Sequence, residues 1–600
     1  MGAQTIYDIL DQAARKWGSL PALHQPIPGG KGYRTYDWVE YRKVVVEIAS
    51  GLRSLGYRRG DILGLASETR AEFYLADLGI MCNGCTAAAV YTSYPSENQV
   101  KTLAACDAKA VFVESPKMLR SLRAAGGDAL AVVWILMTGE ADGVLTMDAV
   151  RAKGREALAA DPGWFDKIHR EVSPDDHAIL YLTSGATGEP KMGLVKHSAI
   201  IANAAMAPPV LEIGPKDATL AFLPSAHITQ RLVMELLMVY MGVPVHFSEG
   251  LTKMPNELRA VRPTFFVAPP RVWERVYASV TTEIRRKPAP LRKLVYMAIG
   301  LGSEAARYRQ RGEAVPGWLK AALKPFNRIV FDKIRARLGG RLRIAASGAA
   351  PLGKELADFY AAIGLPLIEG YGLTEGGVVT LNPTGRPKPG SIGKKLPGAD
   401  LILRIDDDGE LLIKGPTVFA GYYKDPASTA AVLRDGWLYT GDIAELDDDG
   451  YYYITGRKKE LIVSSNGKKI YPARIESLFK VEPIVNQVLL IGDRMPYVTA
   501  LFTVNTAAAE SLNGMEPFRG KTARDIAQAA PVQDEVKRAV SRVNRHLASF
   551  EQIRKFKVVE RDFSIEEGEM TPTMKVRRTR VLENFRERVA EMYAGKEEFL

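Results

Sequence analysis

The chain has 600 residues, more than one hydrophobic core usually serves, so we expect two or more domains. Its hydrophobic fraction of 46% and charged fraction of 25% are those of a globular protein, and no run approaches the ~18 uninterrupted apolar residues of a membrane span. The net charge of +11 would suit nucleotides, coenzyme A or an anionic membrane surface, whereas nucleic acid is disfavoured because zinc-finger spacing and RNP-type strands are absent from the sequence.

Strand-like and helix-like segments alternate through the first ~450 residues, which predicts an α/β fold with layered subdomains. Between Thr380 and Gly436, short strands with Pro and Gly turns indicate a small β-rich subdomain. Charge concentrates around Gly456–Glu460, so we expect a large N-terminal domain at 1–456, a hinge at 457–460 and a smaller, mobile α+β domain at 461–600. The expected strands and helices are Ile62–Ala66, Ala71–Met81, Ala110–Val113, Ala218–Leu223, Thr264–Val267, Arg343–Ala346, Gln487–Gly492, Val498–Val504 and Val532–Ala548.

The three cysteines, Cys82, Cys85 and Cys106, are too few for a disulfide framework and fit a reducing cytoplasm. Cys82 and Cys85 have metal-like spacing, but they lie in an apolar run with no second Cys pair and no nearby His. We therefore predict buried packing cysteines rather than a redox or metal site.

The loop that ends at Lys191 is the strongest local signal. Ala178–Leu182 predicts a buried strand, and the apolar stretch from Ala199 predicts a helix with Ser198 as its N-cap. Glycines, hydroxyls and a lysine lie between them, and such residues can cradle a polyphosphate through backbone N–H groups and positive charge. The spacing is not that of the Gly-x-x-x-x-Gly-Lys-Ser/Thr loop, and an ordinary polar loop is the alternative.

Further motifs follow strand-like runs, where ligands of open α/β sheets collect. His227 comes after Leu223-Pro-Ser-Ala, and small residues occupy Ser347–Pro351. In Glu369-Gly-Tyr-Gly-Leu-Thr-Glu375, Tyr371 could stack on a purine, Thr374 could donate to a phosphate and Glu375 could hold Mg²⁺. A structural His and glycine-rich turns are the alternatives.

Two later motifs carry charged groups. Asp442 and Arg457 could grip the two hydroxyls of a ribose, or could form a plain salt bridge. Lys575, in Met570-Thr-Pro-Thr-Met-Lys, could reach an anion across a domain interface, or could be one of many exposed lysines.

The segment Thr281–Gly340 is strongly basic, with fourteen Lys/Arg against four Asp/Glu and with aromatic residues interspersed. Basic amphipathic helices with aromatics can lie in a membrane interface, and a solvated basic face on a helical subdomain is the alternative.

Six motifs in this order, from residue 181 to residue 575, resemble the adenylate-forming (AMP-binding) superfamily. The chain is most similar to long-chain fatty acyl-CoA synthetases in Pro263–Trp273, in the long basic insert before Gly339 and in the ending Thr571-Pro-Thr-Met-Lys-Val-Arg-Arg. The resemblance implies that a fatty acid attacks the α-phosphate of Mg-ATP to give an acyl adenylate and pyrophosphate. The thiol of coenzyme A then attacks the acyl carbon and releases AMP.

The resemblance also implies roles for individual residues. Lys575, Glu375 and His227 would be catalytic, Glu375 would hold Mg²⁺, Lys459 would be the hinge, and Gly467 would line the tunnel for coenzyme A. ATP would be bound by Thr183, Ser184, Gly185, Thr187, Gly188, Lys191, Ala349, Tyr371, Gly372, Thr374, Asp442 and Arg457.

Three positions depart from the family pattern. Ala186 stands where Thr or Ser is usual, Met192 where Gly is usual, and Gln230 where related enzymes often carry an acid. We expect activity to survive, because the backbone donors and Lys191 are kept.

The resemblance favours a cytoplasmic long-chain fatty acid–CoA ligase over several rival functions. An amino-acid adenylation domain would need an acid just after His227, and a carboxylic acid reductase would continue beyond Leu600. An acyl-AMP ligase that loads a carrier protein and a non-catalytic acyl- or nucleotide-binding homologue stay open. Peripheral contact with the inner face of a membrane, the oligomeric state and the acyl chain length also stay open.

Overall fold

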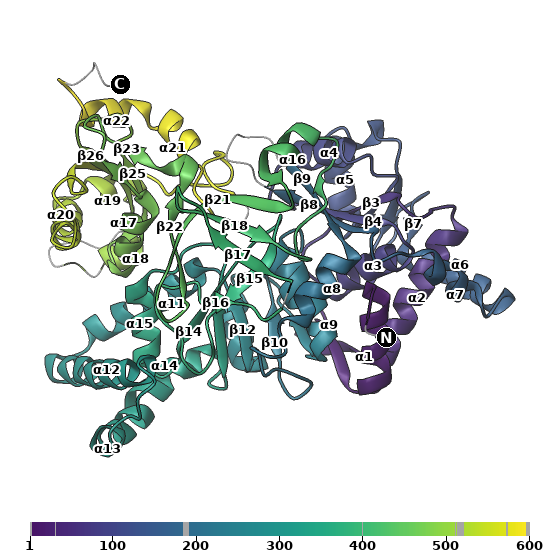
Figure 1. Cartoon of the computed structure of the whole chain (residues 1–600), viewed down its shortest axis with the longest axis horizontal. Helices are drawn as coiled ribbons and strands as arrows, with labels where there is room; N and C mark the ends of the chain where they lie inside the picture. The colour runs from purple at the N-terminus through teal and green to yellow at the C-terminus, as the bar shows by residue number, and fades with distance from the viewer. Residues whose placement is uncertain are drawn as a thin grey trace.

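A computed structural model describes residues 3–30, 32–183, 191–398, 400–510, 512, 521–571 and 574–595. It has a large N-terminal α/β part and a smaller α+β part at the C-terminus, as expected (Figure 1). The predicted fold class is therefore confirmed. Among the described residues, no helix combines the length and apolar character needed to cross a bilayer.

The largest sheet has eight strands in the order β19-β9-β8-β4-β3-β5-β6-β7. Its central strands pair in parallel, and α3 packs against β3 and β4 while α2 covers α3 and α6. The strands are β3 Ile62–Ala66, β4 Thr86–Ala89, β5 Ala110–Val113, β6 Val133–Leu136, β7 Leu145–Thr146, β8 His177–Thr183, β9 Lys191–Lys196 and β19 Gly421–Tyr422.

Two further sheets complete the large α/β body. One has the order β12-β13-β14-β15-β16 and the other β10-β11-β1-β2. Their strands are β1 Pro21–Pro26, β2 Tyr33–Asp37, β10 Thr219–Ala221, β11 Val245–Phe247, β12 Phe265–Ala268, β13 Ile344–Ser347, β14 Leu367–Leu373, β15 Gly377–Leu381 and β16 Lys394–Lys395. Each expected strand in this region is present, although β10 is shorter than predicted.

The helices of this part include two projecting segments, α12 and α13, that extend from the body of the molecule (Figure 1). The helices are α1 Ile6–Trp17, α2 Trp38–Ser54, α3 Ala71–Cys82, α4 Ser96–Ala105, α5 Pro116–Ala124, α6 Met147–Ala160, α7 Trp164–Glu171, α8 His197–Ala205, α9 Leu237–Met241, α10 Met254–Val261, α11 Pro270–Arg286, α12 Ala289–Gln310, α13 Gly317–Phe326, α14 Asp332–Arg335, α15 Lys354–Ala362 and α16 Pro426–Val432. Shorter or π-helical turns are η1 Gly127–Ala129, η2 Thr229–Leu236, η3 Asn327–Phe331 and η4 Ala336–Leu338.

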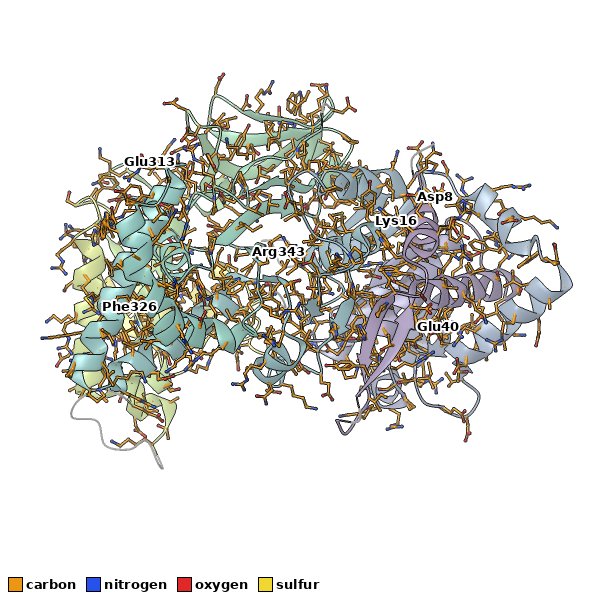
Figure 2. The ribbon with its side chains drawn as sticks, turned by 90° about the horizontal axis from the view of Figure 1, so that it is seen from below. Asp8, Lys16, Glu40, Glu313, Phe326 and Arg343 are labelled. Carbon is orange, nitrogen blue, oxygen red and sulfur yellow. The ribbon has the colours of Figure 1, made fainter. Side chains whose placement is uncertain are left out.

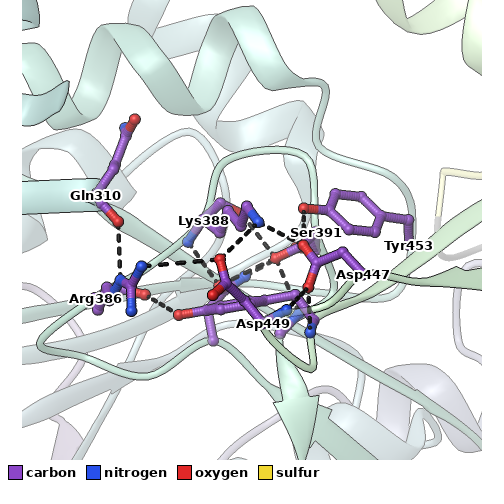
Figure 3. A network of polar contacts seen from close by, with 10 residues as sticks. Gln310, Arg386, Lys388, Ser391, Asp447, Asp449 and Tyr453 are labelled. Atoms are coloured by element: carbon purple, nitrogen blue, oxygen red, sulfur yellow. Dashed lines mark hydrogen bonds and ion pairs between the residues drawn. The ribbon is translucent and has the colours of Figure 1, made fainter. Parts of the chain in front are cut away.

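The β-rich subdomain is a five-stranded antiparallel sheet, in which β22 joins the order β17-β18-β21-β20 through β21. Its strands are β17 Ile402–Ile405, β18 Glu410–Lys414, β20 Leu433–Arg434, β21 Trp437–Leu446 and β22 Tyr452–Arg457. A polar network ties it to the body: Lys388 pairs with Asp447 and Asp449, and Arg386 Nε donates to the carbonyl of Gln310 at 2.9 Å (Figure 3). The C-terminal end of α12 is thereby anchored.

The C-terminal part has its own hydrophobic clusters, drawn from Ile462 onward. A three-stranded sheet, β25-β26-β27, carries the helices, and β23 and β24 form a separate hairpin. The elements are η5 Lys458–Glu460, β23 Ile462–Val463, β24 Lys469–Ile470, α17 Pro472–Leu478, η6 Phe479–Val481, β25 Val485–Ile491, β26 Val498–Val504, α18 Thr506–Ala509, α19 Ala523–Gln528, α20 Ala530–Asn544, β27 Ile553–Val558, α21 Arg578–Asn584 and α22 Arg586–Met592.

Helix α11 forms a polar contact with the C-terminal part. Arg271 donates to the carbonyl of Asn486 at 2.5 Å, and Lys480 pairs with Glu274 at 3.2 Å. These contacts hold the C-terminal part over the large domain in the arrangement described here.

The helix predicted from Ala199 is present as α8, but its predicted N-cap is wrong and the strand that precedes it was not predicted. Lys191 begins strand β9, which pairs antiparallel with β8, and α8 begins only at His197. Ser198 is therefore not the N-cap; Lys196 occupies that position without a side-chain cap. The apolar residues of β9 and α8 are contiguous in sequence, so their periodicities merge and hide the strand. In sequence, the glycine-rich segment therefore lies between two paired strands and not between a strand and a helix.

The cysteine prediction is confirmed, because Cys82, Cys85 and Cys106 are free and buried. Burial raises the pKa of the Cys85 thiol to about 12 and that of Cys106 to about 11. Thiols with such pKa values are inert packing groups at neutral pH.

A buried ion pair lies beneath the π-helical segment η2. Arg231 binds Asp77 of α3 in a bidentate pair, and both side chains are fully buried. Glu235 lies nearby, and its carboxyl oxygens have no hydrogen-bond partner among the described residues. Burial and the Asp77 charge raise the pKa of Glu235 well above its usual value, so it is neutral. The cluster thus holds one cation and one anion.

We expect Arg231→Leu to lower the free energy of unfolding by about 3–5 kcal/mol, because Asp77 would be left buried without its partner. Urea unfolding, compared with the wild type, measures the effect. Arg286→Leu is the matched control: Arg286 is exposed and has no ion pair among the described residues, so its change should stay within about 0.5 kcal/mol. An equal change in the free energy of unfolding for the two variants would contradict a stabilising role of the Arg231–Asp77 pair.

Candidate active site

A single large cavity, of about 1540 Å³, brings most of the motif residues together. It lies between the large domain and the C-terminal part, and residues of β13, β14 and β21 line it. The sequence-predicted residues among those that line it are Thr183, Lys191, His227, Ala349, Tyr371, Gly372, Thr374, Glu375, Asp442, Arg457, Lys459 and Lys575. Ser184, Gly185, Thr187 and Gly188, together with Ala186, lie outside the described residues.

Lys191 and Glu375 meet at Tyr422 of β19. The Lys191 Nζ lies 4.9 Å from the centre of the Tyr422 ring, and the Tyr422 hydroxyl donates to Glu375 Oε1 at 2.7 Å. Thr183 Oγ1 donates to the carbonyl of Lys191 at 3.2 Å, which closes the base of the hairpin. One cation and one carboxylate therefore face the same end of the cavity.

Asp442 and Arg457 are paired across the β21–β22 ladder. Arg457 Nε donates to Asp442 Oδ1 at 2.9 Å, and the Tyr371 hydroxyl donates to Oδ2 at 2.6 Å. The salt bridge that sequence reasoning kept as the alternative is thus present, but both residues also line the cavity. A carboxylate offers about four lone-pair sites, so Asp442 retains acceptor capacity.

The backbone around Ala349 and Gly372 is shaped for close approach. Ala349 has a φ of 69°, in the left-handed region that non-glycine residues rarely occupy. At Gly372 a Cβ would lie 2.5 Å from the carbonyl oxygen of Gly377, so only glycine fits at this β-bulge. Strained residues of this kind cluster at ligand sites.

Glu369 is a buried carboxyl group in the same wall. Oε2 accepts from the backbone N–H of Leu352 at 3.3 Å, while Oε1 has no partner among the described residues. Burial raises the pKa of Glu369 to about 7. A buried acceptor without a partner at a cavity wall favours a ligand that brings a donor.

Lys575 and His227 lie at the junction of the two parts. Lys575 is exposed to the cavity but enclosed by both parts of the protein. Burial and the Arg457 guanidinium lower the pKa of the Lys575 amine to about 8, against the opposing charges of Asp442 and Glu375. Burial and the Lys575 charge lower the pKa of His227 to about 3, so the imidazole is neutral, and its Nδ1 accepts from the N–H of Thr229 at 3.2 Å.

A lysine with a lowered pKa loses its positive charge at a lower pH than an ordinary lysine does. We therefore expect kcat/KM for the ATP-dependent step to fall as pH rises through about 8, because neutral Lys575 cannot offset anionic charge. Lys575→Arg keeps its charge and should flatten the profile in this range. A wild-type profile that stays flat from about pH 7 to 9 would contradict this role.

The same cavity has an apolar lining built from α8, the residues after it, η2 and α9. These elements contact one another, so their side chains form one wall. The apolar lining consists of Ala204, Ala207, Val210, Leu211, Leu232, Val233 and Leu237. Polar and charged groups thus occupy one region of the cavity, and an apolar substrate group could occupy another.

Gly467 does not line this cavity. It belongs to the loop between β23 and β24, in a shallow depression with Ser464 and Arg494. Lys459 lies in η5 and does line the cavity, while the neighbouring Lys458 pairs with Asp408 and Glu410. The arrangement therefore presents Lys575, and not Gly467, to the site.

Sequence reasoning missed Glu369, Tyr422 and the apolar lining. The sequence could have indicated Glu369 as a site residue, because it begins the glycine-rich motif Glu369–Glu375 directly after an apolar run. No sequence pattern could have indicated Tyr422, since it lies 47 residues from Glu375, its hydrogen-bond partner.

Comparison with known proteins identifies the family. The model of the AMP-binding enzyme family matches residues 10–423, and that of the AMP-binding enzyme C-terminal domain matches residues 459–597. The chain belongs to the AMP-binding enzyme family.

Relatives of known name span nearly the whole chain. It is 34% identical to the long-chain-fatty-acid–CoA ligase FadD15 of Mycobacterium bovis, over 91% of this chain and 90% of that protein. It is 27% identical to the long-chain-fatty-acid–CoA ligase ACSBG2 of Xenopus laevis, over 98% of this chain and 84% of that one. The adenylation domain of a carboxylate reductase from Mycobacterium chelonae shares the fold, with a TM-score of 0.74, 20% identity and coverage of 98% and 91%.

Proposed function

We propose that this protein is a long-chain fatty acid–CoA ligase that forms an acyl adenylate from ATP and then an acyl-CoA thioester. The observation that carries the proposal is one cavity that combines Lys575, Asp442 and Glu375 with the apolar lining. A long alkyl chain fits the apolar lining and a triphosphate fits the charged region. The names of relatives at 34% identity over 91% of the chain support the same activity.

In the first half-reaction, a carboxylate oxygen attacks the α-phosphorus, the bond to the β-phosphate breaks, and pyrophosphate leaves. Neither partner needs a protein nucleophile, so catalysis consists of positioning and charge stabilisation. Lys575 would offset the charge on the α-phosphate and the incoming carboxylate. Lys191 and Thr183, with Ser184, Gly185, Thr187 and Gly188, would hold the β- and γ-phosphates, and Thr374 would donate to a phosphate.

The nucleoside would lie between β13 and β22. Ala349, Tyr371 and Gly372 would frame the adenine, and Asp442 and Arg457 would take the ribose hydroxyls. The free Oε1 of Glu369 would accept from the exocyclic amine of adenine. The neutral His227 would position the substrate carboxylate as a hydrogen-bond donor through Nε2.

We propose Glu375 as the protein ligand of Mg²⁺. The described residues contain no cluster of three His, Cys, Asp or Glu side chains that could hold a metal alone. A single carboxylate beside a phosphate site fits, because Mg²⁺ is commonly held by one or two carboxylates together with substrate phosphates. The bound ion would supply charge neutralisation of the phosphates.

In the second half-reaction, the thiol of coenzyme A attacks the acyl carbon, AMP leaves and the thiol proton is released. We propose that residues 461–600 rotate about a hinge at 457–460, centred on Lys459, which withdraws Lys575 and brings Gly467 to line the path of the thiol. The free, buried cysteines are consistent with a reducing cytoplasm, where we place the enzyme.

The test is AMP release from Mg-ATP with fatty acids of increasing length, each with and without coenzyme A. We expect sustained AMP release and thioester formation only with coenzyme A, and the best acid will report the reach of the apolar lining. Adenylate without thioester would replace the proposal with a carrier-loading ligase. No ATP–pyrophosphate exchange with any acid would indicate a non-catalytic binding protein.

A further inference from the structure

The net positive charge of the chain is concentrated in one segment. Residues 281–340 carry fourteen Lys/Arg and four Asp/Glu, a net +10, while the whole chain carries +11. The other residues are therefore almost neutral in sum. Most of the excess lies on α12, α13 and η3, which we call the basic projection.

The basic projection leaves most of its cations unpaired. The four acids of the segment pair with Lys287, Arg307, Arg311, Arg335 and Arg337. Nine other cations of the segment are exposed and have no ion-pair partner among the described residues. Three of them, Arg285, Arg286 and Lys333, lie on α11 and α14 beside the projection. The six on the basic projection are Arg292, Lys293, Arg309, Lys320, Lys324 and Arg328. A solvated face that served only solubility would interleave charges of both signs.

Large apolar side chains are exposed among these cations. Trp318 is 63% exposed, the highest value for a large hydrophobic residue in the described part of the chain. Leu291, Tyr296, Met297 and Ile329 are each about half exposed. Tyr296 and Met297 follow Arg292 and Lys293 by four residues on α12, so cations and apolar groups share one face.

The inner face of the basic projection is firmly packed. Gly302 of α12 lies so close to α15 that a Cβ would fall 2.1 Å from the carbonyl oxygen of Ala362. Leu319 and Leu323 of α13 and Val330 of η3 are buried in the second hydrophobic cluster of the large domain. The outer face is the one left without a partner, on a rigid support.

The projection also stands apart from the rest of the molecule. Phe326 and Glu313 lie at the opposite end of the long axis from Asp8 and Glu40 (Figure 2), and α12 and α13 point away from the body (Figure 1). A flat surface could therefore reach this face without a clash with the main body.

We propose that the outer face of the basic projection docks on an anionic lipid bilayer. Unpaired cations attract acidic headgroups, and Trp, Tyr, Met and Ile side chains enter the interface below them. Charge alone would also suit a nucleic acid, but exposed Trp318, Met297 and Ile329 gain nothing from a phosphate backbone. The inference does not depend on the proposed enzymatic activity.

The first test is flotation with vesicles of phosphatidylcholine alone or mixed with phosphatidylglycerol. We expect binding to the mixed vesicles only, weakened by salt. The variant Lys320→Glu/Lys324→Glu/Arg328→Glu should bind on the order of 100-fold more weakly, at about fivefold for each lost charge. The matched control is Lys101→Glu/Lys117→Glu/Arg120→Glu, which reverses three exposed cations on or beside α4 and α5, far from the projection (Figure 1).

The second test uses Trp318 as a probe of depth. Brominated phosphatidylcholine in the mixed vesicles should quench tryptophan fluorescence, and Trp318→Phe should remove most of the quenching while binding persists. ATP–pyrophosphate exchange or thermal unfolding will show that each variant is folded. Equal loss of binding in both triple variants, binding to neutral vesicles alone, or self-association through this face without vesicle binding would each overturn the proposal.

Discussion

Lys575→Ala is expected to slow acyl-adenylate formation on the order of 1,000-fold, which corresponds to about 4 kcal/mol in the transition state. The amine lies in the cavity with Asp442, Glu375 and Arg457, and burial lowers its pKa to about 8. A positive charge held in the cavity interacts strongly with a pentavalent phosphate, and alanine offers no substitute. ATP–pyrophosphate exchange with the preferred acid measures this step directly.

The same variant should spare the other half-reaction. When acyl adenylate is supplied with coenzyme A, thioester formation should stay within about threefold of wild type, because Lys575 is proposed to leave the site for that step. Lys537→Ala is the matched control, since Lys537 is exposed on α20 and has no ion pair among the described residues. Exchange within about twofold of wild type would remove Lys575 from the first half-reaction.

The sequence was most informative where local pattern and tertiary environment agree. The apolar runs that predicted β3 and β26 have those bounds in the structure, because both strands are almost wholly buried. The motif residues come from different parts of the fold: Tyr371 lies in β14, Asp442 lies in β21 of a second sheet, and Lys575 lies between β27 and α21. The resemblance to the superfamily, and not local pattern, predicted that Asp442, Tyr371 and Lys575 belong to one site, and all three line the cavity.

Other features depend on contacts that no local pattern records. Strand β9 could not be distinguished in the sequence, because its apolar residues Met192, Leu194 and Val195 are followed almost at once by the apolar residues of α8. Tyr422 reaches Glu375 through the β19–β9 pairing, which joins residues more than two hundred positions apart. The φ of 69° at Ala349 is imposed by its surroundings, since alanine has no preference for it.

The apolar lining is the part of the site that is least predictable from the sequence. Ala204, Val210 and Leu232 belong to segments that are equally apolar on their packed sides. Only the structure separates side chains that face the cavity from those that face the core. The buried pair of Arg231 and Asp77 on the other side of η2 was likewise invisible, because the two residues come from distant segments.

Lys459→Pro is expected to have the opposite effect to Lys575→Ala. Proline fixes φ near −65°, which suits the 3₁₀ turn Lys458–Glu460 that contains Lys459. The variant should therefore keep the arrangement in which Lys575 faces the cavity, and adenylate formation should stay within about threefold of wild type. Thioester formation should fall by about 100-fold or more, because Gly467 lies outside the cavity and reaches it only after the hinge dihedrals change.

The measurement is single-turnover thioester formation from preformed acyl adenylate and coenzyme A, set beside ATP–pyrophosphate exchange. Lys459→Ala removes the same side chain without restricting the backbone, so it should behave as wild type in both assays. If alanine and proline are equally impaired, the side chain matters and the hinge does not. If proline impairs both half-reactions equally, the turn is needed for the present arrangement as well, and Lys459 is not the residue about which the two arrangements interconvert. Suppose that Lys575→Ala loses only adenylate formation and Lys459→Pro loses only thioester formation. The same cavity would then serve both half-reactions, with a different face of the C-terminal part turned toward it in each.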